Sequence, residues 1–188
     1  GRPLIGTDIR IVDEDGRELP AGEAGEIVSR GRITMPGYFN RDEATREATW
    51  TDAVGFRWLR TGDVGRVDEE GFLYIVDRKK DMILSGGQNI YPADIEAVMI
   101  GHPDVSEVAV VGVPSERWGE TPLAVVVPRA GAHAEPAALV DWTNARVGKQ
   151  QRISGLVWRD SLPRNPNGKI LKRELRAELA RATGTQAG

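Results

Sequence analysis

The residue with the clearest potential for chemistry is Lys169, in the stretch LPRNPNGKILKREL at residues 162–175. A turn signal, Pro-Asn-Gly, precedes this lysine, and a basic, helix-like segment follows it. An ammonium group held out on a loop can offset negative charge that gathers on reacting phosphate or carboxylate oxygens. The stretch is not a P-loop, because Pro163 and Ile170 stand where that motif requires Gly and Ser or Thr. The alternative interpretation is a plain loop turned by Gly168.

A second candidate is Asp63, in the stretch RTGD at residues 60–63, just ahead of a predicted hairpin. A carboxylate fixed at the entrance of a strand can accept hydrogen bonds from both hydroxyls of a vicinal diol such as a ribose. The alternative is a structural turn, in which Gly62 supplies an unusual backbone angle and Asp63 binds its own neighbours.

The third candidate is the stretch DRKKDMILSGGQNIYPADIE at residues 77–96. Its charged start and flexible Gly-Gly pair predict a pivot that lets one part of the chain reorient against the other. Gly86 and Gly87 would also let a narrow ligand pass close to the backbone. The alternative is an exposed interdomain linker that is charged because it is solvated.

Composition excludes several kinds of site. The 188 residues are 40% hydrophobic and 28% charged, which is typical of a folded globular protein. There is no cysteine, and the two histidines, His102 and His133, are far apart, so we expect neither a metal site nor a Ser-His triad. No segment approaches the length of a transmembrane span and the first residues do not form a signal peptide, which favours the cytoplasm.

Charge is unevenly distributed along the chain, whose net charge is −3. Residues 146–181 carry ten Lys or Arg against three Asp or Glu, so the rest of the chain is acidic. A basic C-terminal part favours an anionic ligand, either phosphates or a nucleic acid. A solvated helix face is the alternative for the residues beyond Lys172.

The segments that must position these residues fall into two parts. Before Asp77 the chain reads as strands joined by tight turns, at 7–13, 25–31, 65–68 and 72–77, with about two helical turns at 41–48. The similar pieces VDEDG and VDEEG indicate shared turn chemistry and not a repeat.

After Asp77 strands and helices alternate. Continuous apolar runs at 107–113 and 122–128 predict strands that are covered on both faces. Helices are predicted at 92–100, 136–147 and 171–182, and a further strand at 153–160. The predicted fold class is therefore α+β or α/β, with a β-rich, barrel-like part at 1–77 and a small mixed-sheet and helix domain at 78–188.

Read together, these stretches resemble the adenylate-forming superfamily, and within it the C-terminal portion of AMP-forming acyl-CoA synthetases, or fatty-acid–CoA ligases. The resemblance covers nearly the whole chain. It rests on GRPLIGTDIRIVD, GEAGEIVSRGRITMPGYFN, WLRTGD and LPRNPNGKILKREL, in this order and at these separations. Such enzymes use ATP, with Mg²⁺, to convert a carboxylic acid to an acyl-adenylate, and CoA then displaces AMP to give a thioester.

The resemblance implies a role for each matching position. Asp63 corresponds to the acid that binds the ribose hydroxyls of ATP, and Arg78 to an arginine that contacts the nucleotide. Lys80 falls at the hinge about which the C-terminal domain rotates between the two half-reactions. Lys169 corresponds to the lysine that this domain inserts for adenylation, and a flexible loop is expected to carry it.

The acceptor thiol is implied by a second set of positions. Gly86 and Gly87 match the place where the pantetheine arm of CoA approaches, and Trp118 matches an aromatic residue beside it. A packed surface tryptophan is the alternative for Trp118, while Arg117 and the basic tail are candidates for the CoA phosphates. Other readings are an adenylation domain that loads a carrier protein, or a non-catalytic module that binds anions or nucleic acid, although no aromatic residue accompanies the basic residues 169–181.

Two stretches depart from the family pattern. GFRWLRTGD reads as if two residues were added before Thr-Gly-Asp, which puts the local strand register in doubt. QQRIS at 150–154 replaces the family's Lys-x-Pro, so Arg152 is assigned no role. The superfamily's phosphate loop, adenine-contacting segment and acyl pocket find no match in this chain. We therefore expect residues 1–77 to be part of a larger N-terminal domain and the chain alone to be inactive. We expect the packing surface that residues 1–77 expose to make this part of the chain dimerise or be poorly ordered. The carboxylic acid substrate is expected to be a fatty acid, although the residues that would specify it find no match in this chain.

Overall fold

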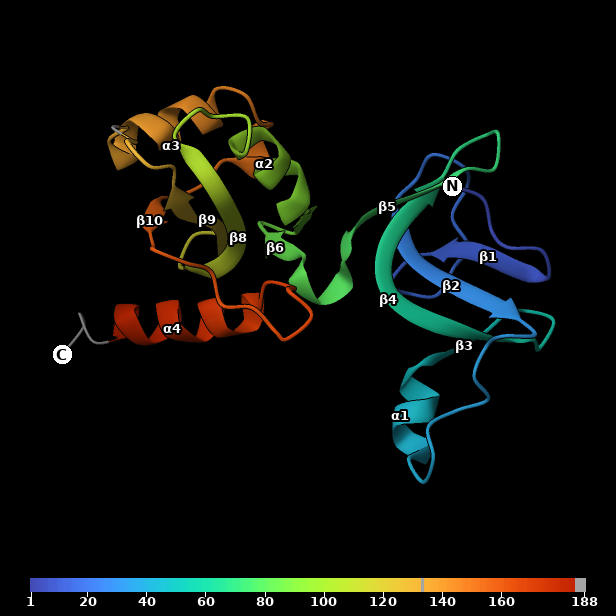
Figure 1. Ribbon diagram of the computed structural model, residues 1–188. Coiled ribbons are helices and arrows are strands. Elements are labelled where there is room, and N and C mark those ends of the chain that lie inside the picture. Colours follow the sequence, from blue (N-terminus) through green and yellow to red (C-terminus); the bar gives the residue numbers. More distant parts are fainter. Residues whose placement is uncertain (133, 185–188) are drawn as a thin grey trace. The chain divides into compact units, whose positions relative to one another are not determined.

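The computed structural model describes residues 1–132 and 134–184, which form two compact units, Gly1–Lys80 and Asp81–Gly188. Figure 1 shows the first unit as strands with one short helix, and the second as a sheet covered by helices. The division lies at 80/81, against a predicted boundary at 77/78.

The first unit is a five-stranded antiparallel sheet with the order β1-β2-β4-β3, in which β5 also pairs with β4. Its elements are β1 (Thr7–Val12), β2 (Gly25–Gly31), α1 (Asp42–Glu47), β3 (Thr49–Thr51), β4 (Arg57–Val67) and β5 (Leu73–Arg78). The long strand β4 is strongly curved in Figure 1 and pairs with three other strands. It is therefore the element that positions the rest of this unit.

Tight turns of the form Asp-x-x-Gly-x recur three times in this sheet. In each, the aspartate N–H donates to the carbonyl four residues on, and the glycine N–H donates back to the aspartate carbonyl. The aspartate Oδ1 also accepts the N–H of the last residue at 2.8 Å, in the turns that begin at Asp13, Asp52 and Asp68. Shared turn chemistry was thus the correct interpretation of the similar pieces VDEDG and VDEEG.

The stretch GFRWLRTGD keeps a regular register with β3, whereas its register with β2 shifts after Arg60. Trp50 pairs with Trp58 across β3 and β4, and the turn that begins at Asp52 contains the residues between these strands. The indole Nε1 of Trp58 donates to Asp52 Oδ2 at 3.0 Å, which ties the turn to the core.

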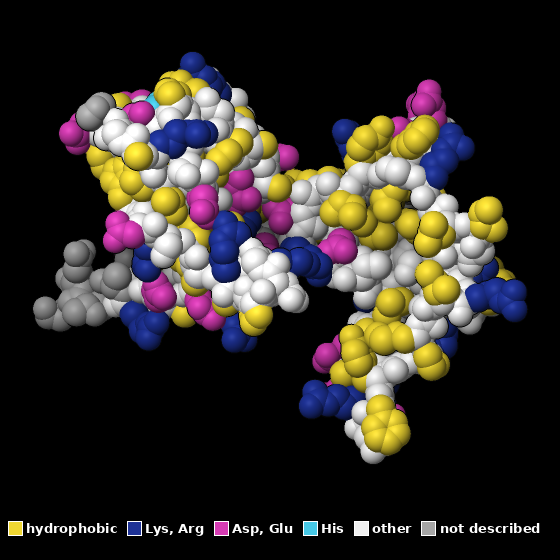
Figure 2. Space-filling view, in the orientation of Figure 1, with side chains coloured by type: hydrophobic (Ala, Val, Ile, Leu, Met, Phe, Trp, Pro, Cys, Tyr) yellow, Lys and Arg dark blue, Asp and Glu magenta, His cyan; other side chains and the backbone are white. Residues whose placement is uncertain are grey.

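The core of the first unit is small. One cluster contains Val12, Val28, Trp50 and Trp58, and Ile11, Ile27 and Val64 are also buried. Many large apolar side chains instead lie on the surface, and Figure 2 shows hydrophobic atoms gathered over this unit. The most exposed of them are Leu4, Ile5, Ile33, Phe39, Val54 and Ile75.

The second unit is a five-stranded mixed sheet with the order β10-β9-β6-β7, in which β8 also pairs with β9. Only the pairing of β10 with β9 is parallel among the strands that the structure describes. The elements are η1 (Lys79–Asp81), which spans the division, β6 (Ile83–Ser85), β7 (Gln88–Ile90), α2 (Pro92–Met99), β8 (Val105–Ser115), β9 (Gly119–Pro128), α3 (Pro136–Asn144), η2 (Lys149–Gln151), β10 (Leu156–Trp158) and α4 (Lys172–Gly184).

The predicted burial of two strands on both faces is confirmed. Alternate residues of β8 face different clusters: Val108 and Val110 pack with α2 and α3, whereas Ala109 and Val111 pack with α4. In Figure 1, α2 and α3 accordingly lie on one side of the sheet and α4 on the other. Because the sheet has helices on both faces, its central strands carry unbroken apolar runs, Val108–Val111 in β8 and Ala124–Val126 in β9.

Two expectations for this unit are corrected. The stretch SGGQN is a tight hairpin and not a flexible loop, since β6 and β7 pair around Gly86 and Gly87. Both glycines have positive φ, 57° and 79°, as a two-residue turn of this kind requires. The strand predicted at 153–160 is only Leu156–Trp158, because the amide of Asn144 binds the backbone N–H and C=O of Ile153 and holds it against α3.

Candidate functional site

Asp63 lies inside β4, within an irregularity of the strand. Glu26 and Val28 of β2 are two residues apart, yet they face Val64 and Arg60, which are four apart on β4. Residues 61–63 therefore bulge out of the ladder, and Gly62 takes a φ of 72°. The expected strand entrance is thus a bulge, a device that re-aims side chains at sites.

The Thr61 hydroxyl holds this bulge in place. It donates to the carbonyl of Ile27 at 2.8 Å and accepts the N–H of Asp63 at 3.1 Å. The sequence did not single out this threonine, although the TGD triplet contains it.

Asp63 and Arg78, the two predicted nucleotide contacts, lie side by side. They are register partners on β4 and β5, and Arg78 Nε is 2.8 Å from Asp63 Oδ1. Both side chains are partly exposed, 25% for the aspartate and 48% for the arginine. Because a carboxylate can accept several hydrogen bonds, this pairing still leaves acceptor capacity for a diol.

A buried carboxylate on the same sheet was missed. Glu26 has only 6% of its surface exposed, and it accepts from Arg60 and, at 2.9 Å, from Lys79 Nζ. The three side chains line an open groove beside Thr61 and Gly62. The stretch GEIVSRG could have predicted this burial, since strand alternation places Glu26 on the same face as the buried Val28.

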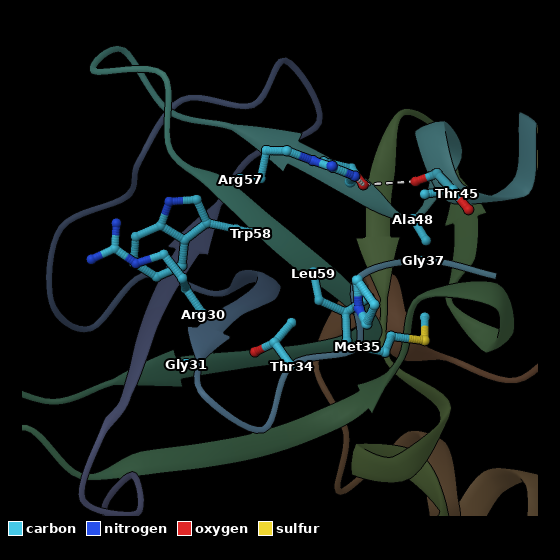
Figure 3. A pocket seen from close by; sticks show the side chains of 12 residues that line it. Arg30, Gly31, Thr34, Met35, Gly37, Thr45, Ala48, Arg57, Trp58 and Leu59 are labelled. Atoms are coloured by element: carbon cyan, nitrogen blue, oxygen red, sulfur yellow. Dashed lines mark hydrogen bonds between the residues drawn. The ribbon is translucent and has the colours of Figure 1, made fainter. Parts of the chain in front are cut away.

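A further hollow of the first unit, of about 250 Å³, contains none of the predicted site residues. Figure 3 shows it between the end of β2, the loop at Thr34–Gly37 and the start of β4. Trp58 and Leu59 line it from β4, and Arg30 and Arg57 stand at its sides.

Lys169 closes a turn built like those of the aspartates in the first unit. Asn165 N–H donates to the Lys169 carbonyl at 2.9 Å, and Gly168 N–H donates to the Asn165 carbonyl at 2.9 Å. Asn165 Oδ1 accepts the N–H groups of Lys169 at 2.9 Å and Asn167 at 3.0 Å. The loop expected to be flexible is therefore a hydrogen-bonded hairpin.

Both legs of this hairpin are anchored. Leu162 is 5% exposed in the cluster beneath α4, and Ile170 packs against the same cluster. Arg164 donates to the Gly168 carbonyl at 2.6 Å and forms an ion pair with Glu107 of β8. The Lys169 side chain is exposed, and among residues 1–132 and 134–184 no hydrogen bond or ion pair of its ammonium group is found. A braced turn thus presents an available cation.

Two of the three predicted CoA contacts, Gly86 and Trp118, line one pocket, and Gly87 adjoins it in the same turn. The Trp118 ring lies over Gly86, where a Cβ atom would come within 2.9 Å of it, and Gly86 N–H donates to the Trp118 carbonyl at 2.8 Å. The guanidinium of Arg117 stacks on this ring, 4.6 Å from its centroid. The pocket, of about 520 Å³, also includes Lys149 and Arg152, to which the sequence had assigned no role. An aromatic ring, a glycine turn and three cationic side chains in one pocket suit a ligand that has a narrow arm and phosphate groups.

The predicted hinge residue, Lys80, is the last residue of the first unit and is exposed in η1. Its neighbour Asp81 forms an ion pair with Arg176 of α4. The second unit therefore begins with a residue anchored to its own C-terminal helix.

Much of the basic charge in residues 146–181 is used internally. Four of its ten cations pair with carboxylates: Arg159 with Glu178, Arg164 with Glu107, Lys172 with Glu96 and Arg176 with Asp81. This pairing weakens the case for the tail as a nucleic-acid surface.

Across residues 1–132 and 134–184 we find no cluster of three or more Asp, Glu or His suited to a metal ion. In the same residues no helix has the length and hydrophobicity needed to cross a membrane.

Comparison with known proteins places these features in a family. Residues 1–39 match the AMP-binding enzyme family, and residues 94–169 match the AMP-binding enzyme C-terminal domain. The chain is 46% identical, over 96% of its length, to the long-chain-fatty-acid–CoA ligase FadD13 of Mycobacterium tuberculosis, of which it covers 34%. It is 44% identical, over 94% of its length, to a 2-succinylbenzoate–CoA ligase of Bacillus cereus, of which it covers 35%. The chain thus spans about a third of the length of these curated relatives.

Solved structures give the same result. ATP-bound MatB of Rhodopseudomonas palustris superposes with a TM-score of 0.88 at 35% identity, over 96% of this chain and 35% of that one. The o-succinylbenzoate CoA synthetase MenE of Bacillus subtilis, in complex with its acyl-adenylate, gives 0.82 at 39% identity, over 94% of this chain and 35% of that one. With both family matches in one chain and the fold of these ligases, this protein belongs to the AMP-binding, adenylate-forming enzyme family.

Proposed function

We propose that this chain acts as the C-terminal part of an AMP-forming acid–thiol ligase. In the first step a carboxylate oxygen attacks the α-phosphorus of ATP, and pyrophosphate leaves. In the second step the CoA thiol attacks the acyl carbon, and AMP leaves. The observation that carries the proposal is the exposed ammonium of Lys169 on a braced turn at the end of the segment that matches the family's C-terminal domain.

Each step uses residues of this chain. Asp63 would accept hydrogen bonds from the ribose hydroxyls, with Arg78 holding the carboxylate and contacting the nucleotide. Lys169 would offset the charge that develops on the oxygens around the α-phosphorus. Mg²⁺ would accompany ATP, and we assign no residue of this chain to it.

The pocket beneath Trp118 would take CoA. Gly86 and Gly87 would lie beside the pantetheine arm, with Gly86 packed under the Trp118 ring and Gly87 facing open space, and Arg117, Lys149 and Arg152 would bind the phosphates of CoA. Lys80 would be the hinge at which the second unit reorients between the two steps.

A fatty acid is the proposed substrate, supported by the similarity to FadD13. Other relatives are named for 2-succinylbenzoate and feruloyl-CoA, so an acid panel has to decide the class. Since the chain covers about a third of these relatives, we further propose that it needs their remaining part for activity and works with it in the cytoplasm.

The test measures pyrophosphate release from ATP with short to long fatty acids and aryl acids, with CoA present. The samples are the full-length protein containing these residues, its Lys169→Ala variant and the 188-residue chain. We expect acid-dependent release by the full-length protein that Lys169→Ala lowers about 150- to 900-fold, because losing the donor raises the barrier by about 3–4 kcal/mol. The 188-residue chain should release none.

The two half-reactions separate the role of Lys169 from general damage. Lys169→Ala should still form thioester from preformed acyl-adenylate, and Arg173→Ala, which removes a nearby exposed cation, should retain both steps. Equal loss of both steps in Lys169→Ala would contradict the assignment, and no release by the full-length protein with any acid would contradict the proposed function.

A further inference from the structure

The turn that carries Lys169 differs in one chemical respect from its three counterparts. All four have the same backbone hydrogen bonds, and a glycine with φ between 80° and 93° at the fourth position. Asp13, Asp52 and Asp68 supply the capping oxygen in the first unit, whereas a neutral amide, that of Asn165, supplies it beneath the lysine.

Turn geometry does not explain this difference. A carboxylate makes stronger, charge-assisted hydrogen bonds to N–H groups than an amide oxygen does. Backbone N–H groups of Phe72 and Glu70 help to hold the pKa of Asp68 below its ordinary value, as expected for such a capped carboxylate. Stability alone would therefore tolerate or favour aspartate at position 165.

Charge around the lysine does explain it. The nearest cation along this hairpin, Arg164, is paired with Glu107. A carboxylate at position 165 would accept the backbone N–H of Lys169, and its negative charge would repel any anion that approaches the ammonium group. An amide builds the same turn and adds no charge.

We propose that Asn165 is a positioning residue that folds the Lys169 turn while keeping the tip of the hairpin free of negative charge, so that Lys169 can attract a phosphate-bearing ligand. The consequence for adenylation rests on the proposed function, whereas the turn and its charge do not. Asn165→Asp should preserve the turn and weaken anion attraction, and Asn165→Ala should lose the turn.

Labelling of the 188-residue chain tests the charge. Pyridoxal 5′-phosphate and uncharged pyridoxal each form an imine with a lysine amine, releasing water, and borohydride supplies the hydride that reduces the imine to a stable secondary amine. Peptide mapping then gives the phosphate-to-neutral labelling ratio at Lys169, in which the intrinsic reactivity of the amine cancels. Lys149, on η2, is the internal control.

In Asn165→Asp the ratio at Lys169 should fall about two- to fivefold at low salt, as expected for a unit charge about 8 Å from a phosphate dianion in water. The fall should largely vanish near 1 M salt, where charges are screened beyond about 3 Å. The ratio at Lys149 should not change. An unchanged ratio at Lys169 would overturn the inference.

Amide hydrogen exchange of the same chain tests the turn. The Lys169 N–H should stay protected in Asn165→Asp and exchange at least tenfold faster in Asn165→Ala. Loss of protection in the aspartate variant, or full protection in the alanine variant, would contradict the positioning role.

The full-length protein then shows whether this geometry matters for catalysis. Adenylation by Asn165→Asp should slow about tenfold while thioester formation from acyl-adenylate is retained. If the unmodified protein forms no adenylate, the proposed function fails, and the labelling ratio still decides the inference about Asn165.

Discussion

Asp52 shows how one residue combines a turn with a core. Burial by itself would raise its pKa, but hydrogen bonds from the Trp58 indole and from the N–H groups of Phe56 and Val54, with the charge of Arg10, hold that pKa below its ordinary value. A carboxyl group whose pKa is lowered by folding stabilises the fold above its unfolded-state pKa, near 3.9.

This linkage gives a pH prediction. The contribution of Asp52 should be fully present at neutral pH and should be lost as pH falls from about 4 through the lowered pKa of the folded state. Asp52→Asn should reduce the free energy of unfolding of the first unit at pH 7 and flatten its decline in acid, because an amide NH₂ cannot accept from the Trp58 indole. Denaturant titrations at pH 7 and pH 3 measure both effects, with the exposed Glu69→Gln as control. If the unfolding free energy of Asp52→Asn fell between pH 7 and pH 3 as much as that of the unmodified protein, Asp52 would not be the source of the acid sensitivity.

At the scale of elements, the β4 bulge links the fold to the nucleotide site. Thr61→Ala removes the hydroxyl that binds both Ile27 and Asp63, so it should cost about 1 kcal/mol of stability. It should also weaken AMP binding by the full-length protein, since Asp63 loses its support. Thr61→Ser keeps the hydroxyl and should stay close to the unmodified protein in both measurements. Equal AMP affinity for the alanine and serine variants would show that the bulge does not depend on this hydroxyl.

The β6–β7 hairpin gives a second test at this scale. Both glycines have positive φ, so alanine at either position should cost about 1 kcal/mol of unfolding free energy. Gly86→Ala should cost more than Gly87→Ala, because its Cβ would lie 2.9 Å from the Trp118 ring, whereas Gly87 faces open space.

A double-mutant cycle isolates this contact. In a Trp118→Ala background, Gly86→Ala should no longer cost more unfolding free energy than Gly87→Ala does. The cost of Gly87→Ala should be the same with and without the Trp118 ring, and denaturant unfolding measures both. Purely additive effects for Gly86 and Trp118 would contradict the stacking.

For the whole molecule, the two units differ in the core that each encloses. The second has two apolar clusters, one on each face of its sheet, while the first has one cluster of four residues and many exposed apolar side chains. Hydrophobic burial is the main source of stability, so the units should differ in stability.

We therefore expect the 188-residue chain to unfold in two steps, the first unit before the second. Hydrogen exchange followed by mass spectrometry, in increasing denaturant, should show β2 and β4 exchanging while β8 and β9 are still protected. A single transition shared by all four strands would show that the units unfold together.

Much of this protein could be read from its sequence because the relevant signals are local. Alternation, apolar runs and turn signals identified most elements, and the ordered set of stretches from GRPLIGTDIRIVD to LPRNPNGKILKREL indicated the family. Signals that depend on long-range pairing were missed or misjudged. The burial of Glu26 between two cations and the position of Asp63 on a bulge both depend on how distant strands align.

The sequence by itself determined which residue types stand where: an acid after Thr-Gly, paired glycines, a lysine after Asn-Gly. Local backbone preferences then dictate turns and hairpins with little help from the rest of the chain. Only the tertiary structure decided which side chains meet, placing Arg78 on Asp63, Trp118 over Gly86 and Arg164 on Glu107. The physical reason is that such contacts join positions far apart along the chain, and strand register and packing, which set them, are properties of the whole fold.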